Sequence, residues 1–238
     1  MTRIRILTFN IHGGRSRDGQ RDLGRVHALM ERFDVDIGVF QEMETRPSFG
    51  GKPSDVDQLA GATRPHHFAA PSMREPPGWY GNLIVSRHKI LEGRIHNLET
   101  RKKFEPRNAL DIFIEAPLGK IRIVGTHLSL SPSERKTEAQ KLIDLVAAIE
   151  EERKTPLFLM GDINEWQMPS KLCRFLDSKM TPVPCKATFP SKMPFLKLDR
   201  IWHDTNSLHV SAHRIDAPEI RLLSDHLPLL IEVRDLDV

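Results

Sequence analysis

The amino-acid sequence predicts a mixed α/β sandwich. Segments with the apolar pattern of β-strands clearly outnumber those with the pattern of helices. Two of the strand-like segments are joined by Pro117-Leu118-Gly119-Lys120, a sequence typical of a hairpin turn. Other strand-like segments alternate with helices. Hairpins pair strands antiparallel, and strand–helix–strand units pair them parallel, so the pattern argues against a uniformly parallel sheet.

In the first part of the chain, one helix is expected between two strands. Arg3–Asn10 alternates as a half-buried strand does. Asp22–Phe33 carries apolar residues at helical spacing, which predicts an amphipathic helix. Val35–Gln41 is a short apolar run followed by Glu42, which indicates a buried strand that stops at the rim of a sheet. Thr45–Asp57 is rich in Gly, Pro and Ser and is expected to be a loop.

The rest of the chain predicts two helices and a further series of strands. The clearest helix runs from Ser133, expected as its N-cap, to Glu152. Pro156–Met160 is a buried strand, and one short helix is expected near Leu172–Leu176 in an irregular stretch. The remaining predicted strands are Trp79–Ser86, Ile90–Leu98, Ala109–Ala116, Ile121–Leu128, Leu196–Trp202, Ser207–Ile215 and Leu227–Val233.

The composition is typical of a globular protein that folds without disulfides or a structural metal ion. The 238 residues correspond to between one and two domains, and 39% hydrophobic with 28% charged residues argue against disorder. Two cysteines, Cys173 and Cys185, cannot make a disulfide framework and are too few for a closed zinc site. Two free thiols are the simplest expectation, in a reducing compartment.

Hydropathy and charge indicate where the protein acts and which class of ligand it could bind. No segment approaches the roughly 20 apolar residues of a transmembrane helix, and the N-terminus lacks the apolar core of a signal peptide. We therefore expect a cytoplasmic protein. The chain has 35 Lys+Arg and 32 Asp+Glu, a net charge of +3. This mildly basic balance permits an anionic substrate without demanding nucleic acid.

Six times along the chain, an apolar strand ends in residues that bind metals, move protons or hold phosphates. Any one of these could be a turn former, a helix cap or a solvated side chain, but six coincident cases are harder to explain in that way. Rigid sheets could hold such residues together at one rim. The strand-end residues are Asn10, His12, Gln41, Glu42, His127, Asp162, Asn164, Asp199, Asp225 and His226.

The chemistry of this set favours a hard divalent cation. Carboxylates without thiolates suit Mg²⁺ or Mn²⁺, and His–Asp combinations suit acid–base work near neutral pH. The chain has no Gly-x-Ser-x-Gly nucleophile elbow, no phosphate-binding loop of the Walker type and no dinucleotide-binding glycine pattern. His66-His67 lacks the surrounding pattern of a binuclear zinc hydrolase, so these two residues are interpreted as structural.

Six short motifs, in this order, resemble the endonuclease/exonuclease/phosphatase superfamily, the DNase I-like metal-dependent phosphoesterases. The resemblance runs from Arg5 to Val233. It implies a single catalytic domain over residues 1–238, folded as a four-layer α/β/β/α sandwich of two mixed, mostly antiparallel sheets. The motifs are Thr8-Phe9-Asn10, Gln41-Glu42, Gly125-Thr126-His127-Leu128, Gly161-Asp162-Ile163-Asn164, Leu198-Asp199-Arg200-Ile201 and Ser224-Asp225-His226-Leu227-Pro228-Leu229.

The resemblance also implies a metal site. Glu42 corresponds to the principal ligand of Mg²⁺ or Mn²⁺, and Asn10 lies beside it in the shell of the metal and the phosphate. Asp225 corresponds to a carboxylate close to the metal. One divalent cation at this position would supply Lewis acidity to the phosphoryl group.

The catalytic roles follow from the same resemblance. Asp162 corresponds to the residue that orients or deprotonates the attacking water, and Asn164 to one that hydrogen-bonds a phosphate oxygen. His226, held by Asp199, would contact the scissile phosphate as an acid–base group or charge stabiliser. His127 corresponds to the histidine that stabilises the transition state and the leaving group. Catalysis of this kind is mainly positioning and electrostatic stabilisation.

The expected partner is an anionic phosphoester: a nucleic acid, a phospholipid head group or a small phosphate ester. The segment 101–108 is either a solvated loop or a place where Arg107 touches a phosphate, with Lys102 and Lys103 extending the positive charge. The small net charge and the lack of an aromatic ladder argue against a dedicated nuclease. Gly125-Thr126-His127 replaces a tyrosine-bearing segment, which disfavours the abasic-site repair branch.

The sequence therefore predicts a monomeric, metal-dependent hydrolase of phosphoesters, most simply a phosphodiesterase. Three alternatives stay open. The chain could be a phosphomonoesterase of the inositol-phosphatase type. It could be a catalytically silent module that binds a phosphate ligand, although such a module would be expected to have lost site residues. It could also be a basic DNA-binding domain, whose binding would be independent of metal and sensitive to salt.

Overall fold

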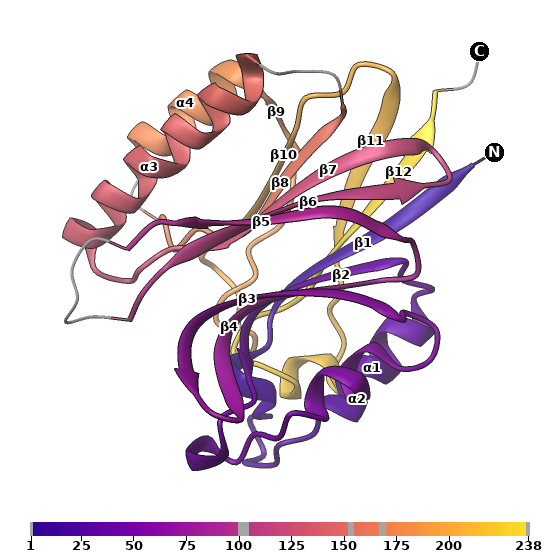
Figure 1. Cartoon of the computed structure of the whole chain (residues 1–238), viewed down its shortest axis with the longest axis vertical. Helices are drawn as coiled ribbons and strands as arrows, with labels where there is room; N and C mark the ends of the chain where they lie inside the picture. The colour runs from indigo at the N-terminus through magenta and orange to yellow at the C-terminus, as the bar shows by residue number, and fades with distance from the viewer. Residues whose placement is uncertain (1, 100–104, 152–154, 167–169, 237–238) are drawn as a thin grey trace.

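Two β-sheets form the centre of the molecule, and helices lie on the outer face of each (Figure 1). A computed structural model describes residues 2–99, 105–151, 155–166 and 170–236. The first sheet contains β1 (Arg3–Asn10), β2 (Ile37–Glu44), β3 (His66–Glu75), β4 (Gly78–Ser86), β11 (Leu208–Arg214) and β12 (Leu229–Asp235). The second sheet contains β5 (Ile90–Asn97), β6 (Asn108–Ala116), β7 (Gly119–His127), β8 (Leu157–Asp162), β9 (Thr181–Pro182) and β10 (Asp199–His203).

The helices complete a four-layer arrangement. In Figure 1, α1 and α2 lie outside the first sheet, and α3 and α4 lie outside the second. The α/β/β/α sandwich implied by the resemblance is therefore confirmed. The helices are α1 (Leu23–Arg32), α2 (Asp55–Ala60), α3 (Pro132–Glu151) and α4 (Lys171–Lys179), with short 3₁₀ turns η1 (His12–Gly14), η2 (Pro47–Phe49) and η3 (Ile220–Leu222).

Both sheets are mixed and mostly antiparallel, as the sequence predicts. Their strand orders are β11-β12-β1-β2-β4-β3 and β5-β6-β7-β8-β10-β9. In the described residues, β1 pairs with β2 and β7 pairs with β8 in parallel, each through a helical crossover, and the other pairings are antiparallel. The predicted hairpin between β6 and β7 is confirmed by the pairing of Ala116 with Gly119. Since β1 and β2 pack against β7 and β8, the ends of both parallel pairs lie close together.

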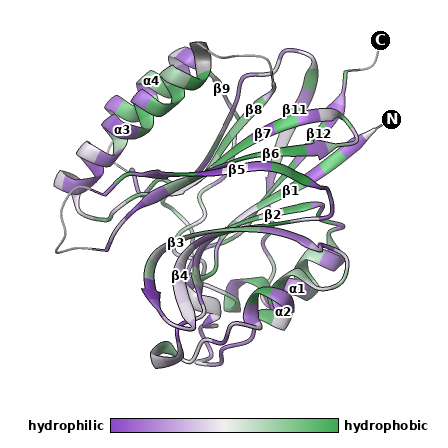
Figure 2. Ribbon diagram, viewed as in Figure 1, coloured by the Kyte–Doolittle hydropathy of each residue, from purple (hydrophilic) through white to green (hydrophobic). Residues whose placement is uncertain are grey.

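The apolar core divides into three layers. One fully buried cluster fills the space between the sheets and includes Ile6, Val39, Ile112 and Met160. A second joins the first sheet to α1, and a third joins the second sheet to α3 and α4. Figure 2 shows the hydrophobic residues concentrated along the strands, while α3 and α4 carry hydrophilic residues as well. The central strands are buried on both faces, which explains their nearly continuous apolar runs.

Three elements were not predicted from the sequence. Strand β3 is at the edge of its sheet, is mostly half-buried and contains Pro71, so its residues lack a clear alternation. Helix α2 has only six residues and lies partly in the segment that we expected to be a loop. Strand β9 has two residues. Each is too short or too irregular to give a periodic signal.

Most predicted elements differ from the structure by one to three residues at an end; the strand predicted to stop at Gln41, for example, continues to Glu44. Two of these differences have a clear local cause. Helix α3 begins at Pro132, so Ser133 lies inside its first turn and is not its cap; proline is well suited to this first position. Strand β10 begins at Asp199 and not at Leu196, because Leu196 pairs with Phe189 across a separate loop. In the described parts of the chain, the structure contains no helix with the length and apolarity needed to cross a membrane.

Candidate active site

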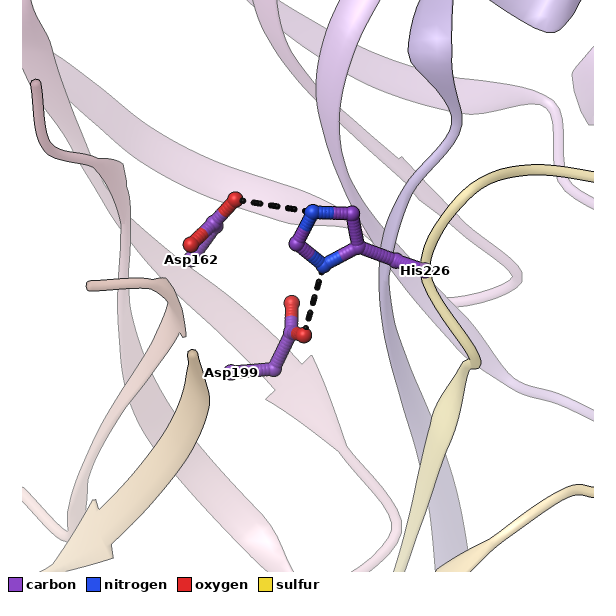
Figure 3. Close-up of side chains that lie close together, drawn as sticks. All are labelled: Asp162, Asp199 and His226. Atoms are coloured by element: carbon purple, nitrogen blue, oxygen red, sulfur yellow. Dashed lines mark hydrogen bonds and ion pairs between the residues drawn. The ribbon is translucent and has the colours of Figure 1, made fainter. Parts of the chain in front are cut away.

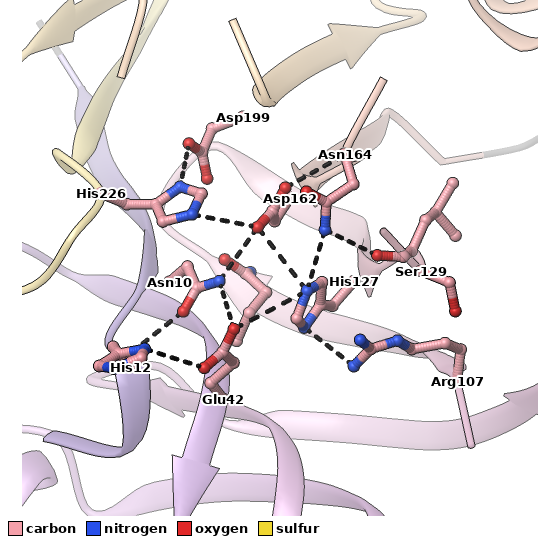
Figure 4. Close-up of polar contacts among 12 residues, drawn as sticks. Asn10, His12, Glu42, Arg107, His127, Ser129, Asp162, Asn164, Asp199 and His226 are labelled. Carbon is pink, nitrogen blue, oxygen red and sulfur yellow. Dashed lines mark hydrogen bonds and ion pairs between the residues drawn. The ribbon is translucent and has the colours of Figure 1, made fainter. Parts of the chain in front are cut away.

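The ends of the two parallel strand pairs bring four polar side chains to one place (Figure 4). Asn10 ends β1, Glu42 lies near the end of β2, His127 ends β7 and Asp162 ends β8. His127 is the direct neighbour of Asp162 in the parallel register. On the other side of β8, Asp162 is paired with Asp199, the first residue of β10. The fold thus gathers residues that are far apart in the sequence.

A β-bulge sets the direction of Glu42. The pairing of β2 with β4 shifts register between Phe40 and Met43, and Glu42 has a φ of 59°, in the left-handed region. Asn164 and His12 also have positive φ. Three of the four non-glycine residues with positive φ in the described chain therefore belong to this site. Such backbone strain is tolerated where it fixes a functional side chain.

Asn10 links two carboxylates at the centre of the site. Its Nδ2 donates to Glu42 Oε1 at 2.9 Å and to Asp162 Oδ2 at 3.0 Å, and its Oδ1 accepts from the backbone N–H of His12 at 3.1 Å. The backbone carbonyl of Asn10 accepts from Ser224 Oγ at 2.7 Å. Asn10 is 1% exposed, so these contacts determine where both carboxylates lie.

Glu42 is held in its ionised form. Burial alone would raise its pKa, but His12, His127 and Asn10 together lower the pKa to about 2. His12 Nδ1 lies 3.6 Å from Glu42 Oε2 and 3.8 Å from Asp225 Oδ1. The side chains of His12 and Asp225 are 52% and 42% exposed. They therefore mark the mouth of the site, with the Glu42 carboxylate just inside it.

His226 lies between two buried carboxylates (Figure 3). Its Nδ1 is 2.8 Å from Asp199 Oδ2, and its Nε2 is 3.4 Å from Asp162 Oδ2. Thr188 Oγ1 also donates to Asp199 Oδ2. Burial alone would lower the pKa of His226, but Asp199 and Asp162 raise it well above its usual range. The raised pKa favours the protonated imidazole, whose Nδ1–H donates to Asp199 and whose Nε2 faces Asp162.

Asp162 and His127 are shifted away from their charged forms. Burial raises the pKa of the Asp162 carboxyl, and Asp199 adds to the effect. Burial lowers the pKa of His127 to about 3, and the charge of Arg107 lowers it further. A carboxyl that can take up a proton thus stands 3.7 Å from a neutral imidazole. Opposite perturbations of this kind, in one cleft, are typical of acid–base sites.

Two further hydrogen-bond donors, Arg107 and Asn164, contact the His127 ring. Arg107 Nη1 lies 3.3 Å from His127 Nδ1, and it also pairs with Glu105. Asn164 Nδ2 lies 3.2 Å from His127 Nε2 and donates to Leu128 O at 2.8 Å. Arg107 is 9% exposed, and its Nε is buried without a hydrogen-bond partner. These are groups that can bind the oxygens of an anion.

The structure brings the residues predicted from the sequence into this one site. Asp225 is the most exposed of them, and Arg107 is linked to Glu42 through His127 (Figure 4). Lys102 and Lys103, which were predicted to extend the positive charge, lie outside the described residues. The predicted site residues are Asn10, Glu42, Arg107, His127, Asp162, Asn164, Asp199, Asp225 and His226.

Three residues of the site had no role predicted from the sequence. His12 was noticed at a strand end, but its contact with Glu42 depends on the left-handed turn that follows β1. Glu105 pairs with Arg107, and the spacing of the two residues could have suggested this contact. Thr188 lies in an irregular stretch, and only the tertiary fold places its hydroxyl on Asp199.

The donors at the mouth fit a hard divalent cation. Glu42, Asp225 and Asn10 offer carboxylate and carboxamide oxygens, the ligands that Mg²⁺ and Mn²⁺ prefer. A second group, Asp162, Asp199 and His226, has ligand atoms that lie within 4.8 Å of one another. In that group, both ring nitrogens of His226 face carboxylates, and Asp199 already accepts from Thr188. The first group is therefore the better candidate for a metal.

Comparisons with known proteins agree with this fold. Residues 7–226 match the sequence profile of the endonuclease/exonuclease/phosphatase family. The chain is 28% identical to the uncharacterized protein YbhP of Escherichia coli, over 97% of this chain and 96% of that protein. It superimposes on an endonuclease/exonuclease/phosphatase from Beutenbergia cavernae with a TM-score of 0.79 and 21% identity, covering 99% of this chain and 72% of that one. The human nocturnin catalytic domain with bound sulfate gives a TM-score of 0.74 at 18% identity, covering 99% and 94%.

Proposed function

The chain belongs to the endonuclease/exonuclease/phosphatase family, and on that premise we propose that it is a metal-dependent phosphodiesterase. The observation that carries the proposal is the placement of His226. Its imidazole is held by Asp199 and faces Asp162, which in turn shares the Asn10 amide with Glu42. A cationic donor, a carboxyl of raised pKa and an ionised carboxylate therefore surround one small space.

Glu42, Asn10 and Asp225 would hold Mg²⁺ or Mn²⁺. The bound ion would supply Lewis acidity toward the phosphoryl oxygens. Glu42 suits this role because its pKa of about 2 keeps it anionic at physiological pH. The exposed side chain of Asp225 leaves the mouth open to an ion from solution.

The remaining residues of the site would position the substrate and activate the attacking water. Arg107, Asn164 and neutral His127 would direct donors at the phosphate oxygens on one side. On the other side of the phosphate, His226 would offset the negative charge that builds up during the reaction. Asp162 would orient the attacking water and take its proton, a role that suits a carboxyl of raised pKa. Human nocturnin carries a sulfate, an anion of similar shape to phosphate.

The test is hydrolysis of bis-p-nitrophenyl phosphate with Mg²⁺, with Mn²⁺ and with EDTA. We expect activity only with a metal ion, and a loss of roughly 10²–10³-fold in Glu42→Gln and in His226→Gln. Glu92→Gln, on the exposed face of β5, is the matched control and should keep full activity. Metal-dependent activity that survives both site substitutions would refute the assigned site. Activity on the monoester p-nitrophenyl phosphate alone would make the chain a phosphomonoesterase.

Two further expectations accompany the proposal. We expect the protein to be a monomer, which size-exclusion chromatography with light scattering would measure. We also expect it to act in the cytoplasm, where fractionation of the source cells would find it. A dimer, or recovery in another compartment, would contradict these expectations without affecting the assigned chemistry.

A further inference from the structure

One loop between β9 and β10, residues 189–196, stands beside the mouth of the active site; we call it the tip loop. Phe189 and Leu196 pair across its base. Ser191 N donates to Asp225 O at 2.6 Å, and Ser191 Oγ donates to Ser224 O at 2.7 Å. The Phe189 ring lies 4.9 Å from the His226 ring. The tip loop is thus fastened to the segment that carries His226.

The tip loop exposes two large apolar side chains. Met193 is 72% exposed and Phe195 is 66% exposed, the highest values among the large hydrophobic residues of the described chain. Leu222, at 44%, is next to it: Arg17 N donates to Leu222 O, and the Arg17 side chain reaches Ser191 Oγ. A single exposed apolar residue is ordinary, but a group that borders an active site indicates an interaction surface.

Two more exposed apolar residues follow the strands that carry the catalytic groups. Leu130 comes shortly after the end of β7 and is 64% exposed, and Trp166 comes after the end of β8 and is 40% exposed. Arg135 connects them: its guanidinium stacks on Trp166 at 4.7 Å from the ring centre and donates to Leu130 O at 2.8 Å. Apolar side chains therefore project from several loops at the end of the sandwich that holds the site.

The tip loop and the residues on either side of it in the sequence carry an excess of basic side chains. Residues 184–200 include Lys186, Lys192, Lys197 and Arg200, with a single acidic residue, Asp199. Asp199 is buried against His226, so it contributes nothing to the surface. The three lysines are exposed. This local excess differs from the near balance of 35 basic and 32 acidic residues in the whole chain.

We propose that the tip loop docks the active site on the surface of an anionic phospholipid bilayer. The inference rests on the proposed function and narrows it, since the phosphodiester at such a surface is that of a phospholipid head group. Apolar side chains can enter the boundary of the acyl chains while the flanking lysines bind anionic head groups. Single-stranded nucleic acid fits less well, because Phe195 is the one exposed aromatic ring of the tip loop and Arg135 already stacks on Trp166, which leaves no series of free rings for successive bases.

The first experiment measures binding of the whole protein to sedimented vesicles in EDTA, where hydrolysis is not expected. Vesicles of phosphatidylcholine alone are compared with vesicles that also contain phosphatidylglycerol. We expect binding to the anionic vesicles and a loss of at least about tenfold in partition when Met193→Ser and Phe195→Ser are combined. The matched control combines Leu91→Ser and Ile95→Ser, two apolar residues of β5 that are 44% and 47% exposed. This control should bind as the wild type does.

A second pair of substitutions tests the charge. Lys192→Gln with Lys197→Gln should weaken binding to anionic vesicles by roughly fivefold per lysine, and added salt should reduce the difference. Bis-p-nitrophenyl phosphate hydrolysis is measured for every variant. Because that substrate is soluble, unchanged activity shows that the tip-loop variants fold and that the catalytic site is intact.

Several results would overturn the docking proposal. These are wild-type protein that stays in the supernatant with anionic vesicles, and tip-loop variants that bind as well as the wild type. A protein that binds the vesicles and hydrolyses the soluble diester, but releases no head groups from phosphatidylglycerol with Mg²⁺, would refute the phospholipid as substrate. Binding of single-stranded DNA that is lost in the same variants while vesicle binding is retained would assign the surface to nucleic acid. Hydrolysis of the soluble diester without vesicle binding refutes docking alone, and vesicle binding by a protein inactive on every diester refutes the proposed function alone.

Discussion

His226 Nδ1 lies 2.8 Å from Oδ2 of Asp199, and each of these side chains is at least 95% buried. Removal of one partner of a buried ion pair leaves the other charge uncompensated, which is costly. The relationship also fixes which nitrogen of His226 faces the space next to Asp162. Asp199 is therefore a positioning residue, and its effect on catalysis must pass through His226.

Asp199→Asn should reduce kcat by roughly 10²–10³-fold while the fold is retained, because the amide keeps the shape of the carboxylate but not its charge. The measurement is kcat and KM for bis-p-nitrophenyl phosphate, with circular dichroism as the check on folding. KM should change much less than kcat, since the substitution does not touch Arg107, Asn164 or His127, the residues proposed to bind the phosphate oxygens. An unchanged kcat would show that His226 works without its carboxylate partner.

The same pair predicts how stability depends on pH. The pKa of His226 is raised from its usual value of 6.5 to about 10, so the folded state binds this proton more tightly than the unfolded state. The resulting stabilisation is fully present below about pH 6.5 and is lost as pH rises through about 10. In EDTA, the free energy of unfolding of the wild type should exceed that of Asp199→Asn most at pH 6. Urea unfolding from pH 6 to 10 measures the difference, and a constant difference would contradict the assignment.

The location of the metal can be tested through thermal stability. A ligand that binds only the folded protein raises the melting temperature. Millimolar Mg²⁺ should therefore raise the melting temperature of the wild type and of Asp199→Asn, but not that of Glu42→Gln. The opposite result, a shift lost in Asp199→Asn and kept in Glu42→Gln, would place the ion among Asp162, Asp199 and His226.

Arg107 should act mainly on substrate binding. Its guanidinium adjoins His127, and its buried Nε has no partner in the structure. Arg107→Gln should raise KM for the diester by roughly tenfold, with a smaller effect on kcat. Arg94→Gln, on exposed β5, is the control that keeps the same change of charge. An Arg107→Gln enzyme with wild-type KM would exclude the guanidinium from the phosphate site.

Glu105 is expected to compete with the substrate phosphate for the guanidinium of Arg107. Its carboxylate pairs with Arg107, so a substrate phosphate must share or displace it. Glu105→Gln should therefore lower KM by a few-fold, since the amide binds the guanidinium less strongly than a carboxylate does. The KM of the double variant Glu105→Gln with Arg107→Gln should equal that of Arg107→Gln alone. A rise in KM in Glu105→Gln would show instead that this carboxylate helps to place Arg107 correctly.

The sequence was informative where the fold uses simple periodic strands. Asn10, His127 and Asp162 each end an apolar strand, so their place at a common rim could be predicted from pattern and order alone. The direction of Glu42 could not, because it depends on a bulge and a left-handed backbone that no apolar pattern encodes. Glu105 and Thr188 lie in irregular segments, where only tertiary contacts decide what a side chain meets.

Gly161 connects the backbone of the site to its chemistry. It has a φ of 138°, and a Cβ atom at this position would lie 2.0 Å from the carbonyl oxygen of Thr126. Any side chain there would push β7 and β8 apart beside the paired residues His127 and Asp162. The substitution Gly161→Ala would thus displace two catalytic side chains, His127 and Asp162, without replacing either of them.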